Sequence, residues 1–197
     1  IVICHDNPYS FILNDRPMSI LSVDGAKDIC IELNSMSKAH NMPGWRMGML
    51  ASNTQFVKWV LREKSNIDSG QFKPMQMATI AALSNPPEWY ARMNKLYAER
   101  RVIAEKIMDL LNCKYDKNQT GLFLWAKIDD NETGSEEFID DILYHANVFI
   151  TPGFIFGSNG ERYIRISLGV STERMWEAYR RIADYVENKE QQKNKRT

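Results

Sequence analysis

One stretch of the sequence decides the fold of this chain: Ser35-Met36-Ser37-Lys38-Ala39-His40-Asn41-Met42-Pro43-Gly44-Trp45-Arg46-Met47-Gly48. The apolar run from Ile29 to Leu33 predicts a short strand before it, and Met47 to Ala51 predicts a second strand after it. Lys38 should therefore lie at the mouth of a strand, on a loop held by rigid elements. A lysine there can act as a nucleophile if its neighbours keep it partly deprotonated. Its polar neighbours Ser35, Ser37 and Arg46 offer the donor groups that an anionic phosphate needs.

The spacing of these residues resembles the cofactor-lysine motif of class I/II aminotransferases, which are fold-type-I enzymes that use pyridoxal 5′-phosphate. The motif is Ser-x-Ser-Lys followed eight residues later by an arginine that has glycines close on both sides. The resemblance implies that Lys38 forms a Schiff base with the cofactor, and that Ser35, Ser37 and Arg46 help to bind it. The alternative is a solvated lysine in a polar loop, because short motifs also occur by chance.

A second element precedes the lysine motif by the interval that the same family shows. Ile1 to Cys4 predicts a buried strand, and Asn7 and Pro8 end it. Asp6 and Tyr9 then match the family's Asp-x-x-Tyr element, in which the aspartate pairs with the pyridine nitrogen and the tyrosine bonds the ring's phenolic oxygen. The other interpretation is an aspartate in a turn and a tyrosine at a loop edge.

A third element lies near the end of the chain. Alternation along residues 162–169 places Arg165 on one face of a predicted strand, and a charged residue in mid-strand needs a partner. The resemblance implies that Arg165 binds the α-carboxylate of the substrate, and that Gly121 begins the family's Gly-x-Phe-x-Trp strand. The alternative is an arginine that forms a structural ion pair with an acidic residue.

Composition excludes several classes of protein. The 197 residues carry 25 basic and 25 acidic side chains, so we expect neither a nucleic-acid surface nor an anionic membrane as partner. The scattered cysteines Cys4, Cys30 and Cys113 fit reduced thiols in a cytoplasmic protein, and the first two should be buried. No metal-ligand spacing and no membrane-spanning run is visible. Since the chain opens in an apolar run without an initiator methionine, we expect a fragment.

The apolar pattern and the resemblance together predict an α/β fold in two parts. Residues 1–88 should be the C-terminal part of the large cofactor-binding domain, with a mostly parallel sheet and helices at 53–64 and 71–84. Residues 89–197 should form a small C-terminal α+β domain with long helices at 89–111 and from Thr172, and a frayed polar tail from Lys189. The apolar faces of the first two helices should pack inward: Phe56, Val57, Val60 and Leu61 in one, and Met75, Met77, Ile80 and Leu83 in the other.

These matches imply an aminotransferase that moves an amino group between an amino acid and a 2-oxo acid, and that forms a homodimer when complete. The fragment alone should be inactive, because the family takes further cofactor contacts from its N-terminal half. Two alternatives remain open. One is a lyase or decarboxylase on the same scaffold, and the other is the effector domain of a transcription regulator. Donors like aspartate, alanine or diaminopimelate are all compatible with the sequence.

Overall fold

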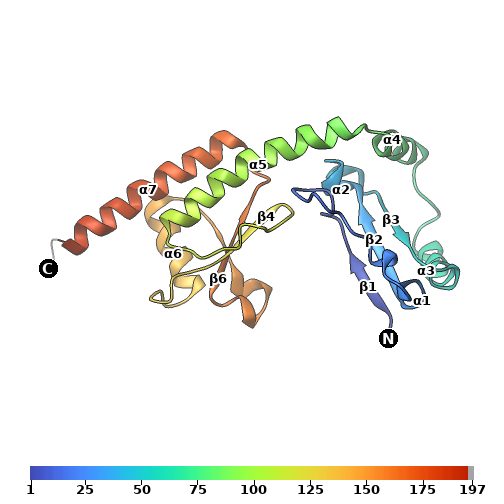
Figure 1. Cartoon of the computed structure of the whole chain (residues 1–197), viewed down its shortest axis with the longest axis horizontal. Helices are drawn as coiled ribbons and strands as arrows, with labels where there is room; N and C mark the ends of the chain where they lie inside the picture. Colours follow the sequence, from blue (N-terminus) through green and yellow to red (C-terminus); the bar gives the residue numbers. More distant parts are fainter. Residues whose placement is uncertain (195–197) are drawn as a thin grey trace. The chain divides into compact units, whose positions relative to one another are not determined.

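The structure, a computed structural model, describes residues 1–194 and divides the chain into two compact units, residues 1–92 and 93–197 (Figure 1). Helix α5 (Pro87–Leu110) crosses this division. The sequence places the domain boundary near Glu88, on the same helix, and that boundary stays a prediction. No helix in the described residues is long and apolar enough to cross a membrane.

Unit 1 contains a three-stranded sheet in the order β1-β2-β3. Strand β1 (Ile3–Asp6) runs parallel to β2 (Cys30–Ser35), and β3 (Gly48–Ala51) is antiparallel to β2. The short helices between the strands are η1 (Ile20–Ser22), α1 (Ala26–Ile29), α2 (Met36–Ala39) and η2 (Pro43–Trp45). Lys38 therefore lies in a one-turn helix directly after β2, and not in the irregular loop that the sequence suggests.

The helices that follow the sheet differ from expectation in their packing. Helix α3 (Thr54–Ile67) buries Phe56, but Val57, Val60 and Leu61 are between 36% and 59% exposed. Helix α4 (Lys73–Leu83) has no buried residue, and Met77, Ile80 and Leu83 are exposed. Phe56 is buried as predicted and Met75 is half-buried. For the other six side chains the prediction of core packing is wrong in the described chain, because no element of residues 1–194 covers them.

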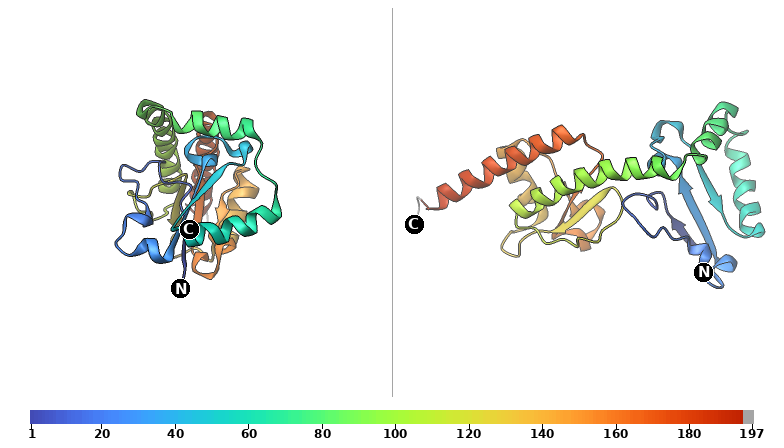
Figure 2. Two further views of the ribbon diagram at one scale, coloured as in Figure 1. Left: turned by 90° about the vertical axis from the view of Figure 1, so that its right-hand side faces the viewer. Right: turned by 45° about the horizontal axis from the view of Figure 1, so that its top comes forward.

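Unit 2 is built around a second three-stranded sheet, which is antiparallel and has the order β4-β6-β5. Its strands are β4 (Phe123–Lys127), β5 (Thr151–Pro152) and β6 (Tyr163–Ser167), with η3 (Gly153–Phe156) and η4 (Ser158–Gly160) between the last two. Helices α6 (Ser135–Ala146) and α7 (Thr172–Asn194) complete the unit, and α7 lies beside the second half of α5 (Figures 1 and 2).

The core of unit 2 follows from strand alternation. Leu124, Ala126 and Ile164 point to one face of the sheet and are at most 1% exposed, as are Ile142 of α6 and Ile182 of α7. This face is covered by helices, as the apolar pattern predicts. The opposite face carries Phe123, Trp125, Tyr163 and Arg165, which are half-buried.

Two smaller expectations are corrected. Cys30 is buried as predicted, but Cys4 is exposed, because β1 is an outer strand of its sheet. The predicted frayed tail is helical as far as Asn194, where α7 ends. Lys189 is tied to α6, since its Nζ donates a 2.8 Å hydrogen bond to Asp141. Residues 195–197 lie outside the described residues.

Candidate active site

The parallel pairing of β1 and β2 brings two of the predicted elements together. Asp6, the last residue of β1, pairs with Leu33, and the next amide, Asn7 N–H, donates to Leu33 O at 2.9 Å. Tyr9 follows in the turn, and its ring centroid lies 6.0 Å from Nζ of Lys38. The ends of parallel strands meet at one edge of a sheet, and ligands of open α/β sheets bind at the carboxyl ends of the strands.

The lysine motif is held in place by its own backbone. Ser35 caps α2 by accepting a 3.1 Å hydrogen bond from the amide of Ser37, and Met36 N–H donates to Met47 O at 3.0 Å. Gly48 is required where β3 approaches β2, because a Cβ there would lie 2.8 Å from the carbonyl oxygen of Asn34. At the other glycine of the motif, Gly44, there is room for a side chain, since a Cβ there would meet nothing within 4 Å.

The residues predicted to bind the phosphate, Ser35, Ser37 and Arg46, lie close in sequence and remain accessible. Ser35 and Ser37 are half-buried, whereas Arg46 is exposed and has a left-handed backbone with φ of 52°. Arg46 Nη1 donates to Pro43 O at 3.0 Å, which folds the side chain over its own turn. Two hydroxyl groups and a guanidinium are a donor set that suits a phosphate monoester. The residues therefore fit the phosphate group of pyridoxal phosphate.

Glu32 is a buried carboxylate that the sequence analysis did not single out. It accepts hydrogen bonds from the Ser19 hydroxyl, from Ile20 N–H at 2.9 Å and from Asn7 Nδ2 at 3.3 Å. Burial alone would raise its pKa, but these bonds outweigh burial and the pKa lies below its ordinary value. An acidic residue within the apolar run from Ile29 to Leu33 was the available signal, since a buried charge needs partners.

Through Asn7, which directly follows Asp6, the bonds to Glu32 also hold the turn that carries the predicted cofactor residue Asp6. Asn7 also donates to Met18 O at 3.1 Å and accepts at its carbonyl from Asn34 Nδ2 at 3.2 Å. His5 Nδ1 lies 3.7 Å from Glu32 Oε2, so His5 faces Glu32. The turn between Asp6 and Tyr9 is thus fixed from the side of the sheet that carries Glu32.

His40 has a partner that the sequence did not reveal. It is buried directly after the lysine helix, and its Nε2 lies 2.9 Å from the hydroxyl of Tyr90 at the start of α5. Trp89 stacks on the imidazole with the ring centroids 6.2 Å apart. Burial lowers the pKa of His40. Because Tyr90 is 50 residues away in sequence, only the tertiary structure brings this pair together.

Arg165 belongs to unit 2 and is described there by itself. It lies in the middle of β6, opposite Trp125 of β4. Its Cζ is 4.2 Å from the ring centroids of both Phe123 and Phe156. Within residues 1–194 Arg165 forms no ion pair with an acidic side chain, so the structural alternative finds no partner there. Gly121, which precedes β4, has a φ of 87° that favours glycine.

Comparison with known proteins gives a consistent picture. The family model of aminotransferase class I and II matches residues 2–182. LL-diaminopimelate aminotransferases from Nitratidesulfovibrio vulgaris and Aquifex aeolicus are 38% and 41% identical over 93% and 92% of this chain. These matches cover 48% and 47% of the relatives, so the chain spans about half their length.

Solved structures agree with the sequence relatives. Apo-BacF from Bacillus subtilis has a TM-score of 0.84 at 35% identity, with 93% of this chain and 47% of that chain covered. The aromatic aminotransferase from Pyrococcus horikoshii has a TM-score of 0.87 at 28% identity, with 96% and 52% covered. The predicted fold class, an α/β fold of the fold-type-I kind, is confirmed. The chain belongs to the class I and II aminotransferases, a family that depends on pyridoxal phosphate.

Proposed function

We propose that the protein containing this chain transfers an amino group between an amino acid and a 2-oxo acid. The observation that carries the proposal is the junction of β1 and β2, where Asp6, Tyr9 and the lysine helix follow two paired strands and Lys38 Nζ lies 6.0 Å from the Tyr9 ring. Pyridoxal phosphate, when bound, supplies an electron-accepting ring that makes the bonds at the substrate's α-carbon labile. The chain supplies the groups that hold the reactants and move the proton.

Each proposed site residue has one task. The Asp6 carboxylate would keep the pyridine nitrogen protonated, the Tyr9 hydroxyl would bond the ring oxygen, and Ser35, Ser37 and Arg46 would hold the phosphate. Lys38 would attach the cofactor. Its freed Nζ would then take the proton from the substrate's α-carbon as general base and return it as general acid. Arg165 would grip the α-carboxylate with two parallel N–H donors and so fix the angle of the reacting bond.

The relatives narrow the substrate. Eight relatives named LL-diaminopimelate aminotransferases are 36–41% identical to this chain, so we propose LL-diaminopimelate as the amino donor. A homodimer in the cytoplasm is the assembly and location we propose. The three free cysteines support a reducing compartment. We expect no nucleic acid and no membrane as partner.

The first experiment asks whether Lys38 is the cofactor lysine. The complete protein is loaded with pyridoxal phosphate, reduced with borohydride and digested, and the labelled peptide is identified by mass spectrometry. We expect the label on Lys38, and we expect Lys38→Ala to lose the label and roughly 10²–10⁴-fold of the transamination rate, as losses of a general base do. The exposed Lys58 on α3 is the matched control, and Lys58→Ala should change neither. Label on another lysine would overturn the assignment.

A further inference from the structure

The guanidinium of Arg165 contacts two aromatic rings. Cζ lies 4.2 Å from the centroid of Phe123 and 4.2 Å from that of Phe156, so both rings are within cation–π range of the guanidinium. An arginine that contacts rings through its faces keeps its N–H donors at the edge of the guanidinium plane. Two cation–π contacts to one guanidinium therefore limit the directions in which Arg165 can bind a carboxylate.

The two rings are held in different ways. Phe123 is part of β4, next to β6 in the sheet, whereas Phe156 belongs to the short helix η3 and is 50% exposed. The loop that carries Phe156 is closed by two glycines in direct backbone contact. A Cβ on Gly160 would lie 2.0 Å from Gly153 O, and a Cβ on Gly153 would lie 2.4 Å from Gly160 O. A side chain at either position would therefore clash with the backbone of the other and force the two segments apart.

Trp125 holds Phe156 from the side of the sheet. The two rings meet edge to face with centroids 5.8 Å apart, and Trp125 also stacks on Tyr163 at 5.3 Å. Edge-to-face pairs of this kind add stability beyond the area they bury. Trp125 is also the residue opposite Arg165 in the β4–β6 ladder. One side chain therefore links the strand that carries Arg165 to the ring of Phe156.

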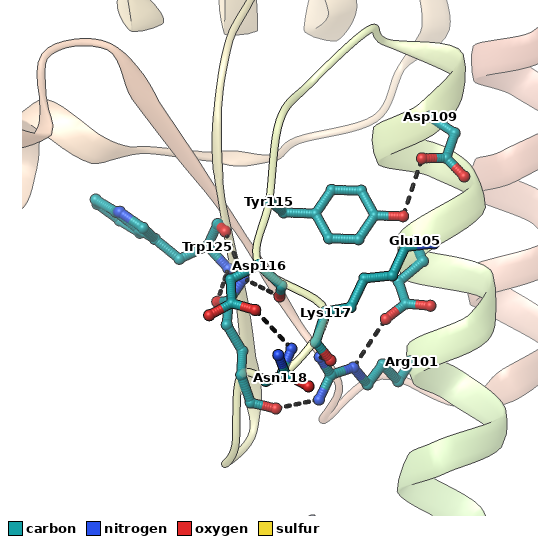
Figure 3. Close-up of polar contacts among 9 residues, drawn as sticks. Arg101, Glu105, Asp109, Tyr115, Asp116, Lys117, Asn118 and Trp125 are labelled. Atoms are coloured by element: carbon teal, nitrogen blue, oxygen red, sulfur yellow. Dashed lines mark hydrogen bonds and ion pairs between the residues drawn. The ribbon is translucent and has the colours of Figure 1, made fainter.

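The outer edge of β4 at Trp125 is closed by a side chain instead of a strand. The Gln119 amide accepts a hydrogen bond from Trp125 N–H and donates one to Trp125 O, both at 2.8 Å. Arg101 of α5 holds this loop by donating to the carbonyls of Gln119 and Lys117, and its Nε pairs with Glu105 at 2.9 Å (Figure 3). The contacts thus run from α5 through Gln119, Trp125 and Phe156 to Arg165.

We propose that Phe156 is a positioning residue for Arg165: it fixes the plane of the guanidinium against Phe123, and Trp125 and Gln119 hold it there. This inference rests on the proposed role of Arg165 in binding the substrate carboxylate. It predicts that the ring of Phe156 contributes to the recognition of carboxylates although it forms no hydrogen bond. The aromatic character should be what matters, because an aliphatic side chain of similar size attracts no cation.

The test compares Phe156→Leu with Phe156→Tyr in the complete protein. The donors are LL-diaminopimelate and 1,5-diaminopentane, which keeps the two amines but lacks both carboxylates. Phe156→Leu should raise KM for LL-diaminopimelate by roughly 3- to 20-fold, the range of a partly desolvated cation–π contact, and leave kcat and the activity on the diamine nearly unchanged. Phe156→Tyr should stay close to the parent enzyme. Ile155→Ala, on the same short helix, is the control for loop damage and should alter neither donor's KM.

Arg165→Ala separates failure of this inference from failure of the proposed function. If it lowers activity on both donors equally, Arg165 does not bind the carboxylate, and both the assigned role and this inference fail. If Arg165→Ala is selective for LL-diaminopimelate but Phe156→Leu behaves like the parent or harms both donors alike, only the positioning role fails. Adding Phe156→Leu to Arg165→Ala should cause no further loss, since the group it orients is gone.

Discussion

The two units bury their apolar residues to very different extents. In unit 2, Leu124, Ile142, Ile164 and Ile182 are at most 1% exposed, because α6 and α7 cover the sheet. In unit 1, α3 buries only Phe56 and α4 buries nothing. Helices with apolar side chains at helical spacing occur in both halves of the sequence. The difference teaches that a periodic pattern indicates which face of a helix is apolar, but not which element covers it.

The difference in burial predicts the largest change in stability for a matched pair of truncations, one in each unit. Ile142→Ala removes a side chain that is 0% exposed, whereas Leu61→Ala removes one that is 59% exposed. We expect Ile142→Ala to lower the free energy of unfolding by about 2–5 kcal/mol, because a cavity remains in the core. Leu61→Ala should change it by no more than about 0.5 kcal/mol.

Urea unfolding of the 197-residue chain, monitored by far-UV circular dichroism, measures both free energies. A large loss from Leu61→Ala would mean that α3 is covered in solution by another molecule. Repeating the titration at several protein concentrations tests for that cover, because association makes the apparent stability depend on concentration.

The next prediction concerns the buried carboxylate that stabilises the otherwise open unit 1. Glu32→Gln keeps the shape of the side chain but replaces the carboxylate, which accepts three hydrogen bonds, with a neutral amide. It should lower the free energy of unfolding by about 1–3 kcal/mol at pH 7. The pKa of Glu32 is lowered in the folded state, so its stabilisation is present above the ordinary pKa of 4.5 and is lost as the pH falls through the folded value. The gap between parent and variant should therefore close in acid.

Unfolding curves at pH 7, 4 and 3 check this slope. Glu63→Gln, an exposed carboxylate on α3, serves as the control and should leave the curves unchanged. A gap between parent and Glu32→Gln that stays constant with pH would show that the charge of Glu32 does not matter.

The smallest expected effect lies at the buried histidine behind the lysine helix. His40→Phe fits the cluster with Trp89 and Tyr90 but loses the bond to the Tyr90 hydroxyl, a loss of about 0.5–1.5 kcal/mol at pH 7. The folded-state pKa of His40 is below its ordinary value of 6.5, so the parent loses stability as the pH falls through 6.5, and the variant does not.

The stability of His40→Phe should therefore approach or exceed that of the parent near pH 5. Thermal unfolding of both proteins at pH 7 and pH 5 measures the change in Tm. Equal shifts for parent and variant would contradict the assignment of this pH dependence to His40.

Much of the candidate site could be predicted from local sequence. The strands on either side of Lys38, the turn at Asp6 and Tyr9, and the position of Arg165 on one face of its strand follow from short apolar runs, turn residues and a period of two. The glycine at position 48 is also visible in the motif, although the reason for it, the carbonyl of Asn34, appears only in the folded sheet. The assignment of these residues to cofactor and substrate stays a proposal.

The sequence by itself determined the family of this protein and the order of its candidate site residues along the chain, because both are encoded in short-range patterns. Only the tertiary structure decided which side chains meet across long separations: Glu32 with Asn7 and Ser19, His40 with Tyr90, and Arg165 with Phe123 and Phe156. Such contacts depend on strand pairing and on the path of loops, which local propensity does not specify. For the same reason the sequence could predict an apolar face on α3 and α4 but could not say that it stays uncovered in the described chain.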